Sequence, residues 1–237
     1  MRHRLIPAAL AAGASLTLLA GTAMAATPTW TVVPSVNPSA TTLNAVFART
    51  ATDAWAVGQF PGAGDDAGSQ IFAERWNGTQ WQQTPTTNIV RQDERLLGVS
   101  ASGPNDAWAV GNGFNNVHDT SATVANQPVI EHWNGTAWSI VTSPAGLISV
   151  DRISAASATD IWASGQAPLQ TIGGVPVPVA KTLRWNGTAW SVMAGPTASD
   201  PSTAVTGLSA LPSGEAWATG ATFSTASATA FIAHHTP

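Results

Sequence analysis

The chain has 237 residues, of which nine are basic and thirteen acidic, with eleven tryptophans and no cysteine or tyrosine. The lack of cysteine excludes disulfides and thiol chemistry, and the lack of tyrosine excludes catalysis by a tyrosine nucleophile of the sialidase type. The net charge of −4 argues against nucleic acid and anionic membranes as partners, because both are bound through basic surfaces.

The first element in chain order is a secretory signal peptide, predicted over residues 1–25. Residues 2–4 are basic, residues 5–20 are apolar, and Ala23-Met24-Ala25 is a cleavage signal. We expect a secreted, extracellular protein that forms one domain over residues 26–237. Removal of two arginines and no acid leaves seven basic and thirteen acidic residues, a net charge of about −6. No later segment offers about 18 continuous apolar residues, so no membrane span is expected.

A motif of an acid, a tryptophan and a glycine then recurs four times. The copies are Asp53 to Gly58, Asp106 to Gly111, Asp160 to Gly165 and Glu215 to Gly220. Their tryptophans are 53, 54 and 55 residues apart. Apolar residues alternate with small or polar ones in and before each copy, which predicts β-strands. This self-similarity at a nearly fixed period predicts a repeat fold.

A second motif, Trp-Asn-Gly-Thr-x-Trp, follows in the first three repeats, where it begins at Trp76, Trp133 and Trp185. Each repeat is predicted to have four strands. In the first repeat they cover residues 43–49, 53–58 and 70–76, and a last strand runs from Trp81 to near Pro85. We expect each Asn-Gly pair to form a two-residue type I′ turn, because both central positions of that turn need a positive φ.

The two ends of the repeat region complement each other. The fourth repeat reaches Ala230–His235, which aligns with a third strand, and Pro28–Pro34 resembles a fourth strand with no repeat before it. We therefore predict an all-β fold, a β-propeller of four blades with four antiparallel strands each. Its ring is closed by the N-terminal strand, which completes the C-terminal blade and removes free sheet edges. A monomer is expected, and a strand-swapped dimer is the alternative.

With these motifs the sequence resembles the Trp-rich repeats of secreted actinobacterial β-propellers, which carry Trp-Asn-Gly-Thr-x-Trp and Asp-x-Trp-Ala-Val-Gly in series. More remotely it is similar to Asp-box (BNR) and kelch repeats and to the propeller of photosystem II assembly factors. The resemblance covers nearly all of residues 26–237 and implies the propeller fold. It implies little about function, because such propellers serve binding, scaffolding and catalysis alike.

Residues that recur in every repeat are most simply explained by folding. The paired tryptophans are expected to pack between blades. The repeated acids are predicted to be turn residues that accept backbone N–H bonds; they are Asp53, Asp106, Asp160 and Glu215. The basic or imidazole residues of the third strands are predicted to lie at one aligned position on a solvated strand face; they are Arg75, His132, Arg184 and His235.

The repeats differ most in the loops after their second strands and in the connections between repeats, which share one face of a propeller. Much of the scarce charge of the chain lies in these segments, and binding sites usually lie in loops held by a rigid scaffold. The candidate ligand-binding residues of this loop face are Asp65, Asp66, Arg91, Asp93, Glu94, Arg95, His118 and Asp119.

We expect a non-catalytic binding module that recognises a glycan, a cell-wall component or a protein outside the cell through this loop face. The alternative is a carbohydrate-active hydrolase or lyase whose loop-face carboxylates, such as Asp66 and Asp93, converge on a substrate. A third hypothesis is a structural ring with an ion held in its channel by backbone carbonyls. No cofactor is predicted; a Ca²⁺ ion in the channel or in a loop is compatible with the sequence, but no ligand spacing specifies a metal.

Overall fold

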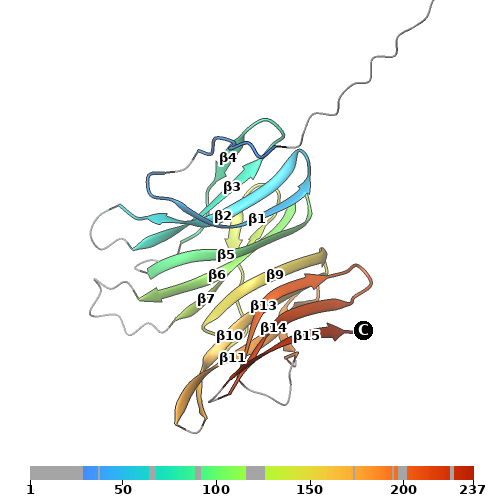
Figure 1. The fold of residues 1–237 in the computed structure, drawn as a ribbon. Coiled ribbons are helices and arrows are strands. Elements are labelled where there is room, and N and C mark those ends of the chain that lie inside the picture. The colour runs from blue at the N-terminus through green and yellow to red at the C-terminus, as the bar shows by residue number, and fades with distance from the viewer. Residues whose placement is uncertain are drawn as a thin grey trace, which may run out of the picture. The chain divides into compact units, whose positions relative to one another are not determined.

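All regular secondary structure in the described residues is β-strand. The structure is a computed structural model that describes residues 29–36, 38–63, 68–88, 92–115, 126–172, 174–193, 195–196, 202–224 and 227–237. The chain divides into two compact units, Met1–Val33 and Pro34–Pro237. Of the first unit only residues 29–33 are described, and they form no strand. The strands described below all belong to the second unit (Figure 1).

The first two repeats each fold into a four-stranded antiparallel sheet with its strands in chain order. The first sheet consists of β1 (Thr42–Thr50), β2 (Asp53–Pro61), β3 (Ser69–Trp76) and β4 (Trp81–Thr84). The second consists of β5 (Gln92–Gly103), β6 (Asp106–Asn115), β7 (Gln127–Trp133) and β8 (Trp138–Ile140). The predicted strand order within a repeat is therefore confirmed for both.

The third and fourth repeats are joined into one seven-stranded sheet. The third repeat consists of β9 (Ser149–Ser157), β10 (Asp160–Ile172), β11 (Val175–Trp185) and β12 (Trp190–Met193). The fourth consists of β13 (Thr203–Ala210), β14 (Ala216–Phe223) and β15 (Ala228–His235). A parallel pairing of Val179 with Thr203 joins them, and the remaining pairings are antiparallel within each repeat.

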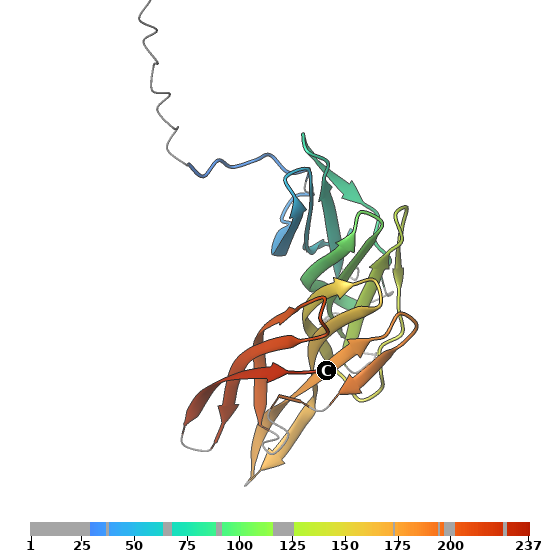
Figure 2. The same cartoon turned by 90° about the vertical axis from the view of Figure 1, so that its right-hand side faces the viewer.

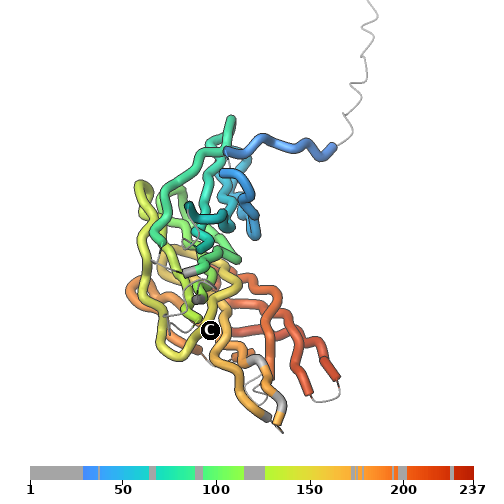
Figure 3. Tube along the Cα trace, turned by 90° about the vertical axis from the view of Figure 1, so that its left-hand side faces the viewer, coloured from blue at the N-terminus to red at the C-terminus, as the bar shows by residue number. Residues whose placement is uncertain are grey.

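Neighbouring repeats pack face to face around tryptophans. One buried cluster surrounds Trp55 and combines side chains of the first and second repeats, and another surrounds Trp108 and combines the second and third. Figures 2 and 3 show the repeats following one another in chain order, from blue to red. The expectation that the tryptophans pack between repeats is thus confirmed for these two joints.

The glycine that ends each Asp-x-Trp motif is required by a β-bulge. The register of β5 and β6 shifts between Leu96 and Gly98, opposite Gly111. A Cβ atom on Gly111 would lie 1.8 Å from the backbone oxygen of Arg95, and one on Gly58 would lie equally close to Thr42. Only glycine allows the two backbones to approach this closely.

The prediction of a two-residue type I′ turn at Asn-Gly is wrong. Trp76 pairs with Trp81, so the hairpin loop has four residues, and only its glycine, Gly78, has a positive φ. The Oδ1 atom of Asn77 instead accepts the backbone N–H of Thr79 at 3.0 Å and caps the loop. The loops that begin at Asn134 and Asn186 are capped in the same way. Asparagine is needed here for its side-chain oxygen and not for a positive φ.

The N-terminal strand predicted over Pro28–Pro34 is not formed in the described part of the chain. Residues 29–36 carry no strand, and the side chains of Trp30 and Val32 are exposed. A strand needs a neighbour for its backbone hydrogen bonds, and these residues have none among the described pairings. Likewise β15 pairs only with β14, and β1 only with β2, so the described sheets do not close into a ring. The closed four-bladed propeller stays a prediction.

Candidate functional site

The repeated acid of each repeat binds a side chain of the third strand. Asp53, at the start of β2, accepts a hydrogen bond from Nε of Arg75 at 2.8 Å and another from Nε of Arg49 at 2.7 Å. The guanidinium of Arg75 in turn lies over the ring of Trp55, 5.2 Å from its centroid. Burial alone would raise the pKa of Asp53, but the hydrogen bonds and charges of Arg75 and Arg49 outweigh it and hold this pKa below its ordinary value.

The same arrangement of an acid, a basic residue and a tryptophan recurs in the other repeats. The acids and their partners are Asp106 with His132 at 2.6 Å, Asp160 with Arg184 at 2.8 Å, and Glu215 with His234 at 3.8 Å. These arginine and histidine side chains lie against Trp108, Trp162 and Trp217, with His132 and His234 stacked on their rings. Because it recurs in every repeat, the arrangement belongs to the fold.

Two predictions about these residues need correction. The hydrogen bonds found for the repeated carboxylates come from side chains, whereas backbone N–H donors were expected. The aligned residue of the fourth repeat is His234, which pairs with Trp217, and not His235, which pairs with Ala216. The third strand of the fourth repeat has two histidines and no tryptophan, so the sequence alone does not show which histidine aligns with Arg75, and the prediction chose the wrong one.

Three of the eight predicted loop-face residues lie in the described part of the chain, side by side at the start of β5. They are Asp93, Glu94 and Arg95. The remaining candidates lie outside the described residues; they are Asp65, Asp66, Arg91, His118 and Asp119. The three described residues are consecutive in one strand, so their side chains alternate between its faces and do not converge on one pocket.

Asp93 and Glu94 are engaged in structural contacts. One carboxylate oxygen of Asp93 accepts the backbone N–H of Ser69 at 2.7 Å and its hydroxyl at 3.1 Å, which ties β5 to the start of β3. Glu94 is 1% exposed, and Glu131 of β7, whose pKa is raised in part by the charge of Glu94, is 0% exposed. A ligand in solvent therefore reaches neither glutamate.

Glu131 is a buried acid that sequence reasoning missed. Its Oε1 accepts the backbone N–H of Thr87 at 2.8 Å, whereas its Oε2 has no hydrogen-bond partner among the described residues. Burial first, and then the negative charge of Glu94, raise the pKa of Glu131 to about 7. The sequence carried one signal, a glutamate inside the apolar run Val129-Ile130-Glu131.

Glu74, the equivalent glutamate of the first repeat, accepts hydrogen bonds from the chain segment that precedes that repeat. The hydroxyl of Ser35 donates to its Oε2 at 2.5 Å, and the backbone of Val36 donates a second hydrogen bond. Burial raises the pKa of Glu74 despite these bonds. Thr87 and Ser35 therefore make equivalent contacts. Each lies in the segment that precedes a repeat and donates a hydrogen bond to the buried glutamate of that repeat.

Arg95 is a partly exposed residue among the described loop-face candidates. Its Nε donates to Oδ1 of Asn112 at 3.0 Å, and its guanidinium lies 5.3 Å from the ring centroid of Phe114. On the third repeat, Asp151 is bonded to Gln166, and burial raises its pKa although the charge of Arg95 acts in the opposite direction. Arg95, Asn112, Phe114, Asp151 and Gln166 thus combine a cation, an aromatic ring, an acid and two amides; we call them the Arg95 patch.

Among the described residues, no three His, Cys, Asp or Glu side chains come together as metal ligands. Nor does the described part of the chain contain a helix with the length and apolar character needed to cross a bilayer.

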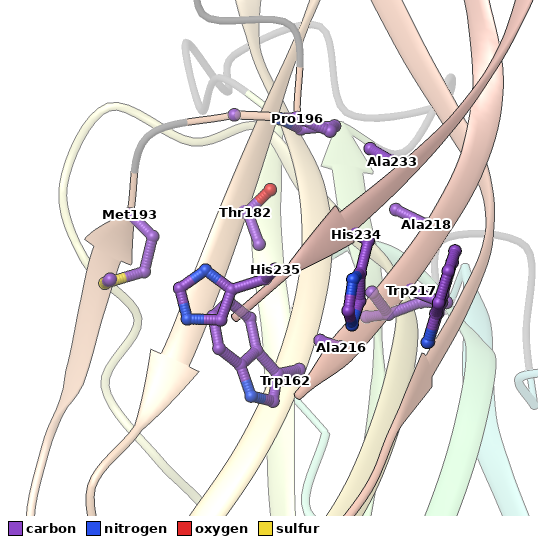
Figure 4. A pocket seen from close by; sticks show the side chains of 12 residues that line it. Trp162, Thr182, Met193, Pro196, Ala216, Trp217, Ala218, Ala233, His234 and His235 are labelled. Carbon is purple, nitrogen blue, oxygen red and sulfur yellow. The ribbon is translucent and has the colours of Figure 1, made fainter. Parts of the chain in front are cut away.

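A cavity of about 290 Å³ lies away from the loop-face candidates, at the joint of the third and fourth repeats. Its lining includes Trp162, Met193, Pro196, Ala233 and His235, and Figure 4 shows the rings of Trp162 and His235 beside each other in it. Sequence reasoning missed this cavity. The available signal was that the fourth repeat has a histidine pair where the others have the first tryptophan of Trp-Asn-Gly-Thr-x-Trp.

Comparison with known proteins gives no information on function, so functional inference depends on the fold and on these contacts. No protein-family model matches the chain, and no curated protein matches its sequence.

Proposed function

We propose that the four repeats are blades of a β-propeller and that a strand around Trp30 completes the sheet of the fourth. The order of strands within each repeat and the tryptophan joints between repeats support this assignment. The connector at Ser35 adds independent support, because it binds Glu74 as the connector after β4 binds Glu131. The segment that binds Glu131 follows β4, the last strand of the preceding repeat, so the segment at Ser35 is expected to follow a strand in the same way.

We further propose that the protein is a secreted binding module that recognises a glycan, either free or in a cell wall, through the loop face. The Arg95 patch is the observation that carries this proposal. A sugar ring has both apolar and hydrogen-bonding groups. The patch offers partners for both, because it combines a partly exposed aromatic ring with amide and charged groups that accept and donate hydrogen bonds. A protein ligand is the second possibility, since aromatic and arginine side chains also anchor protein interfaces.

The alternative of a hydrolase or lyase is favoured by no specific contact of the described residues. Glycoside hydrolysis needs two carboxyl groups that face the scissile bond. Glu94 and Glu131 are shut off from solvent, and Asp93 is bound by Ser69. The binding module is therefore our proposal.

The test is binding of the Arg95→Gln variant to a glycan array and to purified cell-wall polysaccharide. We expect loss of at least about tenfold in affinity, because hydrogen bonds to a charged group contribute about 1.5–3 kcal/mol. Arg49→Gln is the matched control, since it removes the same charge at an arginine of the first repeat whose partner is Asp53. Equal losses in both variants, or release of cleaved sugar by the wild-type protein, would contradict the proposal.

A further inference from the structure

The second and third repeats each cover the buried tryptophan of the repeat before them with two aromatic rings. Trp133 and Trp138 of the second repeat contact Trp55 of the first, with ring centroids 5.2 and 5.0 Å apart. The corresponding rings at the next joint are Trp108, Trp185 and Trp190, with centroid distances of 4.9 and 5.5 Å. These edge-to-face and tilted contacts are favourable geometries for aromatic pairs.

The joint between the third and fourth repeats has one ring where the others have two. His235 takes the position of the first tryptophan and contacts Trp162 with a centroid distance of 4.6 Å. Beside these two rings lies the cavity of about 290 Å³ (Figure 4). An engineered apolar cavity of about 150 Å³ already holds benzene, so this one has room for an indole.

The residues that line the cavity indicate that it lies where the second covering tryptophan of this joint would be. Met193, three residues after Trp190, lines it. Thr84 is three residues after Trp81 in the first repeat, and its Oγ accepts the indole N–H of Trp138 at 3.0 Å. The residue at this repeat position therefore contacts the second tryptophan of the next repeat where that tryptophan is present.

Trp30 is the tryptophan that fits this place by its position in the repeat. Five residues after Trp30, Ser35 binds the buried glutamate of the first repeat. Six residues after Trp81, Thr87 binds that of the second. Trp30 thus precedes the first repeat as Trp81 precedes the second, and its side chain is fully exposed.

The first and fourth repeats also leave complementary surfaces uncovered. Trp217 is 45% exposed, whereas the tryptophans at its position in the other repeats are at most 2% exposed. Among the described contacts, Trp76 and Trp81 touch each other, with centroids 5.8 Å apart, and no tryptophan of another repeat. Trp217 therefore lacks the two covering rings that a following repeat would supply. The first repeat has two such rings, and among the described contacts they cover no tryptophan of another repeat.

We propose that these surfaces join two copies of this chain. Trp30 of one copy enters the cavity of the other, its strand pairs with β15, and its Trp76–Trp81 pair covers Trp217 of the other copy. The inference rests on the proposed completion of the fourth sheet by the Trp30 strand, and it names the source of that strand as a second copy.

The joints already formed favour a second copy over the same chain. Three successive joints connect the four repeats, and closure within one chain would need a turn of about 90° at each joint. After these three joints β13–β15 lie against the third repeat, and they do not meet β1–β4 in either view (Figures 1 and 2). Reciprocal joining of two copies covers the free faces of the first and fourth repeats and gives β15 a partner strand.

The test is a double-cysteine variant, Val32→Cys with Ala233→Cys. By the register of β3 and β4, where Glu74 pairs with Gln83, these two positions are opposite each other in the completed sheet. Directly paired Cα atoms lie about 4.5–5.5 Å apart, which suits a disulfide. The natural chain has no cysteine, so no other disulfide competes. Val32→Cys with Val46→Cys is the control, because Val46 is exposed and lies in β1.

Non-reducing electrophoresis of the oxidised variant separates the outcomes. A covalent dimer, absent from the control and abolished by reductant, supports the second copy. A band of one chain whose mobility changes on reduction shows closure within the chain and overturns this inference while keeping the proposed blade completion. Absence of any disulfide overturns both, and the loop-face binding proposal is then still tested by Arg95→Gln.

Light scattering of the variants without cysteine gives a second readout. We expect the wild-type protein to have twice the mass of one chain and Trp30→Ala to have the mass of one. Leu169→Ala, which removes another exposed apolar side chain, is expected to keep the dimer. A wild-type protein with the mass of one chain at all concentrations would overturn the inference.

Discussion

At the scale of single residues, Glu131 makes stability depend on pH. Its pKa is about 7 in the folded chain against an ordinary value of 4.5, so the fold prefers the protonated acid. This contribution to stability is fully present below about pH 4.5 and is lost as the pH rises through about 7. By pH 8 the loss is on the order of 3 kcal/mol, because each unit of pKa difference corresponds to about 1.4 kcal/mol.

Glu131→Gln is expected to keep the bond from Thr87 and to remove the titration. In urea unfolding, the variant should equal the wild-type protein near pH 4 and exceed it at pH 8. Gln82→Asn, which changes an exposed neutral side chain of β4, serves as control and should leave the pH dependence unchanged. Parallel curves for Glu131→Gln and the wild-type protein would show that Glu131 does not titrate in this range.

At the scale of the elements, the bulge opposite Gly111 is the feature least tolerant of change. Gly111→Ala places Cβ against a backbone oxygen that cannot move without breaking the pairing of β5 with β6, and we expect a loss of about 3 kcal/mol or more. Gly103→Ala is the matched control in the same sheet, because nothing lies within 4 Å of its Cβ position. The comparison is made by urea unfolding, and equal midpoints for the two variants would contradict the bulge argument.

The strands could be predicted from the sequence because their signal is local. Alternation and the repeated motifs located the first residues of β2, β6, β10 and β14 to within one position, although β10 extends seven residues beyond the motif. The four-residue hairpin loop at Asn77 could not be predicted in the same way, since Asn-Gly suits a type I′ turn equally well and the pairing of Trp76 with Trp81 decides between them. The candidate site was predicted least well. Glu94 is buried because β5 packs against strands of the neighbouring repeats, such as β3 and β9, which lie far from it in the sequence.

At the scale of the whole molecule, each joint is built from one buried tryptophan and the rings that cover it, so the order of the repeats follows from these contacts. This makes stability a sum over neighbouring repeats, as in other repeat proteins. A substitution at a covered tryptophan weakens one joint within the chain. The same substitution at Trp217 removes a ring that the described part of the chain leaves partly uncovered.

The final prediction compares two tryptophans at the same repeat position. Trp108→Ala should lower the free energy of unfolding by about 3–5 kcal/mol at any protein concentration, because its ring is buried within the chain. Trp217→Ala should cost much less in dilute solution, where its ring has mainly His234 as a partner. If a second copy covers Trp217, the wild-type protein gains up to about 2.7 kcal/mol from a hundredfold rise in concentration, and Trp217→Ala does not. Urea midpoints at two concentrations measure this difference; a cost of Trp217→Ala that is independent of concentration would contradict a joint between copies at this face.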